Sequence, residues 1–257
     1  MEENTYKLFD FDIAVGSCRE LLLRATALLG KGGAICTVNP EILALAANDI
    51  TLSRYLHSSL NIPDGVGVRY ALSLRGVRTD TLPGVELGER LLDVTPVRLG
   101  IIGGKEGIAE AALASLAARH KKMTPALAAS GYGKRYEEYR EMIEESLADV
   151  IYVCLGTPKQ EHFILHMKEL FPNILFIGLG GSADVYSGAL ARAPLIFRRA
   201  RAEWLYRVLR EPRRILRLPR LFTFAYRAIF YKKTKKFGQK GRNKGDFLKK
   251  LRKIDKF

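Results

Sequence analysis

The sequence predicts an α/β fold, with a Rossmann-like, mainly parallel sheet that helices cover on both faces and a basic helical appendage at the C-terminal end. Two observations lead to this prediction. Between residues 34 and 177, short apolar segments typical of buried strands alternate with helix-like segments, and loops of a few residues join them. Such alternation indicates strand–helix–strand units with parallel strands. Beyond Arg198 the composition becomes strongly basic.

The first part of the chain begins this alternation. Leucine and alanine recur at helical spacing over residues 12–29, and Gly32-Gly33 ends the expected helix. A short strand is expected over residues 34–38. Asn39 can cap the next helix, and Pro40 suits its first position, because the N–H that proline lacks would have no helical partner there.

From Val97 onward the alternation is strict. Glycine follows the expected strands, as at Gly103-Gly104 and in the segment Gly131-Tyr132-Gly133. Ligands of parallel α/β sheets bind at the carboxyl ends of the strands, so these loops are candidate binding loops. The expected strands are 97–102, 127–129, 150–155 and 174–177, and the expected helices are 108–120 and 135–147.

Two of these loops form the expected floor of a binding site. One runs from Gly156 to Glu161 and the other from Gly178 to Asp184, each directly after a buried strand. Their strands belong to the same predicted sheet, so both loops lie at its carboxyl edge. The arginine-rich segment that follows them is expected to act as a lid.

The first loop is expected to begin a helix. Thr157 is the expected cap and Pro158 the first helical residue. Gln160 would then lie in the first turn, near free backbone N–H groups and the positive end of the helix dipole, which suits a phosphate or a sugar hydroxyl. An ordinary helix start explains the same residues equally well.

The second loop fits the dinucleotide fingerprint G-x-G-x-x-A over residues 178–183. The acidic residue that should follow about 20 positions later is missing, and the sequence there is basic. A tight turn that binds another phosphate group therefore fits better than a redox cofactor site. A NAD(P)-dependent oxidoreductase is the weaker alternative.

Asp64 is the candidate general base. It lies in a turn-rich loop over residues 61–67, after which another helix is expected from Val68. A carboxylate at a loop tip that faces a cleft can take a proton from a substrate. Aspartate is also common in turns for structural reasons. The same two alternatives apply to Asp184.

Neither a metal site nor a disulfide is expected. His162 and His166 are four residues apart, without a third ligand at a suitable spacing. Cys18, Cys36 and Cys154 predict buried thiols in a reducing compartment. The first residues have no signal-peptide pattern, and no apolar run reaches the roughly 18 residues of a membrane span. We therefore expect a cytoplasmic protein.

The net charge of +15 is unevenly distributed. Residues 198–257 hold 22 Lys and Arg against 4 Asp and Glu, whereas the rest holds 20 against 23, so the two parts carry +18 and −3. This asymmetry indicates a polyanionic partner for the basic part, either a nucleic acid or an anionic membrane. Because the other part offers no basic cleft, we expect no nucleic-acid partner. We expect two units, residues 1–197 and 198–257.

The basic part has two patterns. Arg207, Arg210, Arg214 and Arg217 recur at helical spacing. Residues 221–231 are rich in aromatic side chains and flanked by Lys and Arg, but eleven helical residues span only about 16 Å. This pattern predicts a helix that lies in a membrane interface, with a helix packed on the body as the alternative. The tail beyond about residue 232 is expected to be flexible.

Seven short motifs occur in a characteristic order. They are Asn39-Pro40-Glu41, Ile62 to Gly67, Gly103-Gly104-Lys105, Gly156 to Glu161, Gly180 to Asp184, Arg192-Ala193-Pro194 and Glu203 to Arg207. No single motif is specific, but the ordered set closely resembles the WecG/TagA/CpsF family of bacterial glycosyltransferases (glycosyltransferase family 26). The resemblance runs from about Tyr6 to about Tyr231.

The resemblance implies an inverting, metal-independent glycosyltransferase without a cofactor. Such enzymes transfer an N-acetylmannosamine-type sugar from a UDP donor to undecaprenyl-diphosphate-linked N-acetylglucosamine, toward wall teichoic acid or a related surface glycan. Use of another UDP-hexose, glucose or N-acetylmannosamine uronate, for capsule or exopolysaccharide is the alternative. The implied partners are a UDP-sugar, a polyprenyl-diphosphate-linked sugar and the anionic inner face of the cell membrane, with a homo-oligomer left open.

The resemblance also assigns residues. Asp64 matches the family's proposed general base. The residues expected to bind substrate are Thr37, Asn39, Gly103, Gly104, Tyr132, Gly156, Gln160, Gly180, Gly181, Asp184 and the appendage arginines Arg207, Arg214 and Arg217. One departure concerns the R-x-x-G-x-D stretch of the family, where this chain has Thr81 before Gly84 and Glu86 in place of the aspartate. A phosphate contact is therefore expected to be lost or moved.

Overall fold

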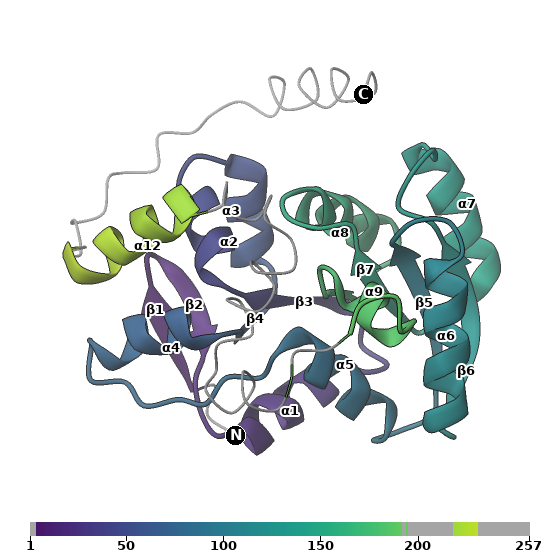
Figure 1. The fold of residues 1–257 in the computed structure, drawn as a ribbon, viewed down its shortest axis with the longest axis horizontal. Coiled ribbons are helices and arrows are strands. Elements are labelled where there is room, and N and C mark those ends of the chain that lie inside the picture. Colours follow the sequence, from purple (N-terminus) through teal and green to yellow (C-terminus); the bar gives the residue numbers. More distant parts are fainter. Residues whose placement is uncertain (1–3, 192–193, 195–217, 231–257) are drawn as a thin grey trace.

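The computed structural model describes residues 4–191, 194 and 218–230. These residues form an eight-stranded sheet in the order β1-β2-β4-β3-β8-β7-β5-β6, and helices cover both of its faces (Figure 1). Every neighbouring pair is parallel except β1 with β2. The predicted α/β fold with a Rossmann-like, mainly parallel sheet is confirmed.

Strands and helices alternate along the chain. The strands are β1 (Thr5–Leu8), β2 (Phe11–Ala14), β3 (Gly33–Val38), β4 (Leu60–Pro63), β5 (Val97–Gly103), β6 (Met123–Ala129), β7 (Val150–Cys154) and β8 (Leu175–Gly178). The helices are α1 (Cys18–Thr26), α2 (Pro40–Leu45), α3 (Ile50–His57), α4 (Val66–Ser73), α5 (Gly84–Leu92), α6 (Ile108–Arg119), α7 (Tyr136–Ser146), α8 (Lys159–Leu170), α9 (Ser182–Tyr186) and α12 (Leu218–Phe230).

Side chains on the two faces of the sheet enter two separate cores. Cys36 and Val153 point into the first core, and their neighbours Ile35 and Tyr152 point into the second. The first core also receives residues of α2, α3, α4, α7, α8 and α12, and the second receives residues of α1, α5, α6 and α9. Burial on both faces explains why the central strands are almost continuously apolar.

The single helix predicted over residues 12–29 is wrong at its beginning. Residues 11–14 form β2, where Asp12 is exposed between buried neighbours. The helix starts only at Cys18, because Ser17 and Glu20 form a capping box at its N-terminus. Pairing with β1 and β4 supplies backbone partners that a sequence pattern does not reveal.

The turn-rich loop predicted over residues 61–67 also begins with a strand. Residues 60–63 form β4, which lies between β2 and β3 in the sheet. Asn61 is buried there, and its Nδ2 donates to Asp12 O at 2.9 Å and to Leu56 O at 2.7 Å. The tertiary structure thus supplies acceptors for the Asn61 amide nitrogen, whereas its Oδ1 is buried without a partner among the described residues.

Helix α12 is the described part of the predicted C-terminal appendage. Phe224 and Ala228 are buried in the first core. Arg220 forms an ion pair with Glu41 of α2, and Arg75 Nη1 donates to Ala228 O at 3.0 Å. One face of the helix is therefore docked on the sheet domain.

The remaining part of the predicted appendage is not described. The boundary between residues 197 and 198 and the tail beyond residue 232 lie outside the described residues. Over the ranges that the structure describes, no helix combines the length and apolar character of a membrane span.

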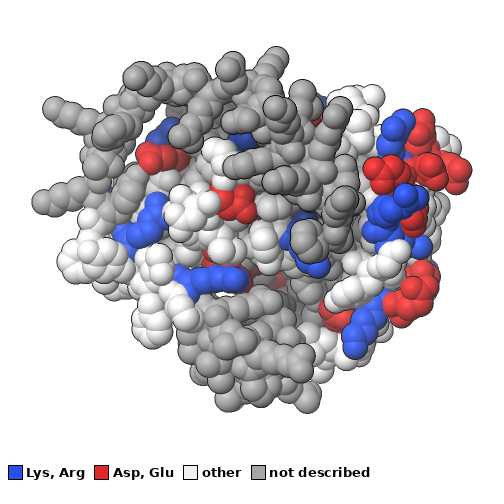
Figure 2. Space-filling model, turned by 90° about the horizontal axis from the view of Figure 1, so that it is seen from above, with Lys and Arg blue, Asp and Glu red and all other residues white. Residues whose placement is uncertain are grey.

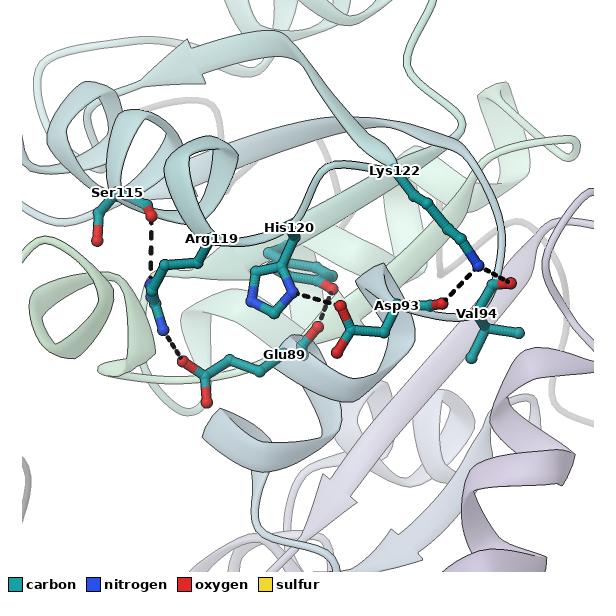
Figure 3. Close-up of polar contacts among 9 residues, drawn as sticks. Glu89, Asp93, Val94, Ser115, Arg119, His120 and Lys122 are labelled. Carbon is teal, nitrogen blue, oxygen red and sulfur yellow. Dashed lines mark hydrogen bonds and ion pairs between the residues drawn. The ribbon is translucent and has the colours of Figure 1, made fainter.

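Polar contacts connect the ends of α5 and α6 at the amino edge of the sheet (Figure 3). His120 Nδ1 lies 2.7 Å from Asp93 Oδ1, and Lys122 Nζ donates to Asp93 O at 3.0 Å. Arg119 of α6 forms an ion pair with Glu89 of α5. These contacts join the segments that lead into β5 and β6, so their role at this edge is structural.

Asp149 connects the beginnings of three central strands. Its Oδ1 accepts a hydrogen bond from Arg98 Nη2 at 2.7 Å, and its Oδ2 accepts one from Arg98 Nε at 3.1 Å. The Arg98 N–H also donates to Oδ2 at 2.9 Å, and the Leu175 N–H donates to the Asp149 carbonyl at 3.0 Å. Hydrogen bonds from the Arg98 side chain lower the pKa of the Asp149 carboxyl below its ordinary value.

We expect Asp149→Asn to lower the melting temperature at neutral pH by roughly 2 to 4 °C, the shift that about 1 kcal/mol causes in a chain of this size. The pKa of Asp149 is lower in the folded protein than in the unfolded chain. The stability that the Asp149 carboxylate contributes is therefore complete above the unfolded pKa of about 3.9, and it is lost as the pH falls through the native pKa. The melting temperatures of Asp149→Asn and of the wild type should therefore converge as the pH falls from neutral to about 3.

Glu145→Gln is the matched control, because Glu145 is an exposed acid on α7. This control should follow the wild type at every pH. If the melting temperature of Asp149→Asn stayed below that of the wild type by a constant amount down to the lowest pH, the role assigned to the ion pair would be contradicted.

Candidate active site

The sheet topology marks the centre of the carboxyl edge as the expected position of a ligand crevice. Strands β4, β3, β8 and β7 are neighbours in that order, so the loops that follow them lie side by side. Helix α2 follows β3 and packs in the first core, whereas α9 follows β8 and packs in the second. Neighbouring strands whose connections leave toward opposite faces open a crevice where α/β proteins bind ligands. We take this position as the candidate site.

Strand β3 contributes two of the predicted residues. Thr37 is buried, and its Oγ1 donates to Gly178 O at 2.9 Å, which joins β3 to the end of β8. Asn39 caps α2 as predicted, since its Oδ1 accepts from the Ile42 N–H at 3.0 Å and Pro40 begins the helix. The cap uses one lone pair of Oδ1, so Asn39 can still offer a ligand its amide NH₂ group and the second lone pair.

Asp64 follows β4 and lies beside Asn39, because Val38 and Pro63 pair in register. Its N–H donates to Val38 O at 2.7 Å, and the residue is half-buried. Gly65 has φ +82°, a conformation that favours glycine, and α4 begins directly after it. A half-buried carboxylate at this edge can exchange a proton, as a general base must.

Gln160 joins the loops that follow β7 and β8. Its Oε1 accepts a hydrogen bond from the Gly180 N–H at 2.9 Å, and only 3% of the residue is exposed. Gly178 permits this contact, because a Cβ atom on it would lie 2.9 Å from Gln160 Nε2. The Gly180 N–H, which a dinucleotide pyrophosphate would need, is already bonded. This geometry argues against the dinucleotide alternative.

Glu161 lies beside Gln160 and was missed by the sequence analysis. The residue is completely buried. Its Oε1 accepts hydrogen bonds from Gln160 Nε2 at 2.7 Å and from Thr157 Oγ1 at 3.1 Å, whereas Oε2 has no partner among the described residues. Burial raises the pKa of the Glu161 carboxyl, and the two hydrogen bonds oppose this only in part. An acid in a first helical turn is common, so no sequence signal distinguishes Glu161.

Thr157 does not cap α8, and the prediction is wrong there. The helix begins at Lys159 with Pro158 in the cap position. Instead of capping the helix, the Thr157 hydroxyl donates a hydrogen bond to the buried Oε1 of Glu161. A buried carboxyl oxygen needs such donors. Gly156, with φ +74°, provides the turn between β7 and this segment.

Asp184 lies on α9, on the β8 side of the crevice. It is half-buried, and its carbonyl accepts from the Leu190 N–H at 2.8 Å. Gly180 has φ +55°, and a Cβ atom on Gly181 would lie 3.8 Å from Asp184 Oδ2. Asp64 follows β4 and Asp184 follows β8, the two strands on either side of β3, which lie two strand spacings or about 10 Å apart.

The structure does not bring Tyr132 to this crevice. Tyr132 is exposed in the loop after β6, which β7 and β5 separate from β8 by about 14 Å at ordinary strand spacing. Gly103 is explained by packing, because a Cβ atom on it would lie 2.3 Å from Cys154 O. Gly104 has φ +74°, and its carbonyl accepts from the Gly131 N–H at 2.8 Å. These contacts account for both glycines without a ligand.

Several other expected residues have definite positions. His162 Nε2 lies 2.9 Å from Asp49 Oδ2, and His166 is exposed. Cys36 and Cys154 are buried as predicted, whereas Cys18 is only half-buried. Over the ranges that the structure describes, no three His, Cys, Asp or Glu residues gather as metal ligands. The residues Arg207, Arg214 and Arg217 lie outside the described part of the chain.

We expect Glu161→Gln to change the pH dependence of stability. The raised pKa means that the folded state favours the neutral carboxyl, so the stability contributed by Glu161 is complete below the unfolded pKa of about 4.3 and declines as the pH rises through the native value. Glutamine keeps an acceptor oxygen for Thr157 and Gln160 and does not ionise. Relative to the wild type, the melting temperature of the variant should rise between about pH 4 and neutral pH.

Glu144→Gln, at an exposed position on α7, is the control for the loss of one carboxylate. The difference in melting temperature between Glu144→Gln and the wild type should stay constant over this pH range. If Glu161→Gln instead lost stability relative to the wild type as the pH rises, Glu161 would have to be a stabilising charge rather than a neutral buried group.

Comparison with known proteins assigns the family. The model of the Glycosyl transferase WecG/TagA/CpsF family matches residues 6–238. The N-acetylglucosaminyldiphosphoundecaprenol N-acetyl-beta-D-mannosaminyltransferase of Bacillus subtilis is 33% identical over 214 residues, which cover 80% of this chain and 82% of the relative. Proteins of the same name are 36% identical over 202 residues in Bacillus spizizenii and 32% identical over 198 residues in Staphylococcus aureus, and each match covers 75% of this chain and 78% of the relative.

The family match begins in β1 and continues past α12, so it includes every loop of the crevice. It confirms the resemblance that the ordered motifs indicate, because it spans well over half of the chain. The chain belongs to the WecG/TagA/CpsF family of glycosyl transferases.

Proposed function

We propose that the chain transfers N-acetylmannosamine from UDP-N-acetylmannosamine to N-acetylglucosamine on undecaprenyl diphosphate, with inversion at the anomeric carbon. The observation that carries this proposal is the half-buried Asp64 beside the crevice of β3 and β8, in a chain whose relatives bear the name of this transferase. The product would serve the synthesis of wall teichoic acid or another surface glycan.

The reaction is a single displacement. The acceptor hydroxyl oxygen forms a bond to the anomeric carbon of the donor sugar while the bond from that carbon to the UDP oxygen breaks. Asp64 takes the hydroxyl proton as a general base, and UDP leaves with the electron pair. The growing negative charge on UDP requires cationic partners, and we assign this role to Arg207, Arg214 and Arg217.

We assign the two sides of the crevice to the two substrates. The acceptor belongs on the β4 side, because the base must reach its hydroxyl and Asp64 follows β4. The UDP donor belongs on the β8 side, where Asp184 lies and where a Cβ atom on Gly181 would meet only Asp184 Oδ2 among the described residues, so the backbone there can approach a phosphate group. Thr37, Asn39 and Gln160 lie between or beside these loops and are proposed to shape the pocket.

We further propose that α12 lies against the cytoplasmic face of the membrane. Its outer face, formed by Phe222, Tyr226, Ile229 and Phe230, is 62–71% exposed, whereas the opposite face is docked on the sheet domain. An exposed apolar and aromatic face on a helix with basic neighbours suits a membrane interface. The lipid-linked acceptor proposed above is found in the same place.

A nucleic-acid partner has less support. In the view of Figure 2, the Lys and Arg side chains of the described residues are mixed with Asp and Glu side chains. A protein that binds nucleic acid typically presents a continuous basic patch or stripe. The described residues of this face have none in that view.

Asp64→Asn is expected to lower turnover by roughly 10²- to 10⁴-fold, the usual contribution of a general base. Asparagine has the same shape and cannot take the proton, so the affinity for UDP should change little. Transfer to the lipid-linked acceptor and calorimetric binding of UDP measure the two effects. Asp12→Asn, at an exposed position on β2, is the control and should keep full turnover. Near-normal turnover of Asp64→Asn would exclude Asp64 as the base.

Replacing Phe222, Tyr226 and Phe230 together by serine should weaken binding to vesicles that contain phosphatidylglycerol by about tenfold or more, because the interface loses three aromatic side chains. Sedimentation with vesicles measures this effect. Leu23→Ser removes an exposed apolar side chain on α1, in the other helix layer, and should bind vesicles like the wild type. Unchanged vesicle binding of the triple variant would show that the outer face of α12 is not the contact surface.

A further inference from the structure

A hollow of about 610 Å³ lies beside the loop that carries Asp64. Its walls are the beginning of α1, the helix α4 and the segment 77–80. This segment runs past the end of β4, since the Leu82 N–H donates to Pro63 O at 3.0 Å and the Asp80 N–H donates to Gly16 O at 2.8 Å. The hollow is therefore at the carboxyl edge of the sheet, next to the acceptor side of the crevice.

Two arginines with uncommitted side chains line the hollow. Arg69 comes from α4 and Arg78 from the segment opposite. Neither guanidinium forms a hydrogen bond or an ion pair with another described residue. Two guanidinium groups that line one hollow can together bind an anion that carries more than one charge.

The two acids of the hollow are already used in the start of α1. Glu20 Oε2 accepts from the Ser17 N–H at 2.7 Å and from Ser17 Oγ at 2.8 Å, and these bonds lower the pKa of the Glu20 carboxyl. Asp80 Oδ2 accepts from the Cys18 N–H at 3.0 Å. Both carboxylates are therefore bonded to the N-terminal turn of α1, and neither forms an ion pair with Arg69 or Arg78.

The helix α4 places the hollow between the base and an apolar surface. Asp64 lies two residues before Val66, the first residue of α4, and Arg69 lies three residues or about 4.5 Å further along the helix axis. Ser73 is one turn beyond Arg69 and also lines the hollow. Tyr70 and Leu74 lie on the adjacent face of α4 and are 61% and 48% exposed, and α12 packs against the same helix.

This order matches the order of groups in a lipid-linked acceptor. The sugar hydroxyl must reach Asp64, a diphosphate follows the sugar, and the lipid follows the diphosphate. Along α4 and the segment that follows it, the corresponding features are the base, the arginines and the exposed apolar residues Tyr70 and Leu74, and α12 packs against the same helix. A donor such as UDP-sugar has no apolar end and does not match this order.

We propose that Arg69 and Arg78 bind the diphosphate of the polyprenyl-diphosphate-linked acceptor in this hollow. The proposal rests on the proposed function and adds the residues that recognise the acceptor. Both arginines are binding residues, because their guanidinium groups would contact the phosphate oxygens directly.

The test uses Arg69→Gln, Arg78→Gln and the double variant of the full chain. Each single change should raise the KM for the lipid-linked acceptor by about tenfold, since it removes a charged hydrogen bond, and the double change should raise it further. The KM for the UDP-sugar and kcat should stay within about twofold. Arg140→Gln removes an exposed arginine on α7 and is the matched control.

A binding experiment gives a second, independent measurement. Farnesyl diphosphate and inorganic pyrophosphate are titrated into wild-type and variant protein, together with UDP. We expect farnesyl diphosphate to bind more tightly than pyrophosphate, and we expect the double variant to lose both while it keeps its affinity for UDP. Melting curves without ligand show that the variants are folded.

The outcomes separate the possible sources of the anion. A loss of UDP affinity in the double variant would assign the hollow to the donor and overturn the proposal. Unchanged acceptor KM, or unchanged binding of farnesyl diphosphate, would also overturn it. If the wild type has no transferase activity, the proposed function fails, and the farnesyl diphosphate titration still decides whether the arginines bind a lipid diphosphate.

Discussion

The parallel pairing of β3 with β8 is the constraint on which the rest of the structure depends. Cys36 pairs with Gly178, the last residue of β8, so β3 continues for two residues beyond the end of β8. The helices that follow the two strands pack on opposite faces of the sheet, and such a divergence marks the position where α/β proteins bind ligands. The strand order then determines which side chains meet there. Asp64 arrives from one neighbouring strand and Gln160 from another, although the two residues are far apart in the chain.

The floor of the crevice is held by a buried carboxyl group. Glu161 accepts from both Gln160 and Thr157, and this fixes the Gln160 amide in one orientation, with its nitrogen toward Glu161 and its oxygen toward the Gly180 N–H. A buried carboxyl with an unbonded oxygen is unfavourable in itself. The fold tolerates this cost because the same group joins the loops of β7 and β8. A binding loop held in this way does not have to be ordered again when the substrate arrives.

Helix α4 connects the chemistry to the surface. It begins directly after Asp64, one face lines the arginine-containing hollow, and its exposed residues lie beside α12. The docking of α12 through Arg220, Phe224 and Ala228 leaves the aromatic residues of its other face exposed. A base, a cationic hollow and an apolar surface therefore follow one another along a single direction. An acceptor with a sugar at one end and a lipid at the other can use all three at once.

Patterns between residues close in the chain were sufficient to predict the alternation of strands and helices and the Asn39 cap. They also predicted the loop position of Asp64 between β4 and α4. They failed where distant segments supply the partner. Residues 11–14 and 60–63 are strands because neighbouring strands supply their hydrogen-bond partners. Thr157 donates to a buried carboxyl group, and Arg69 and Arg78 line the same hollow only because the segment 77–80 returns past β4. The spacing of residues close in the chain determines secondary-structure propensity and helix caps, whereas the strand order determines which side chains are buried. The tertiary structure alone therefore decides that Glu161 is buried and that Arg69 and Arg78 line one hollow.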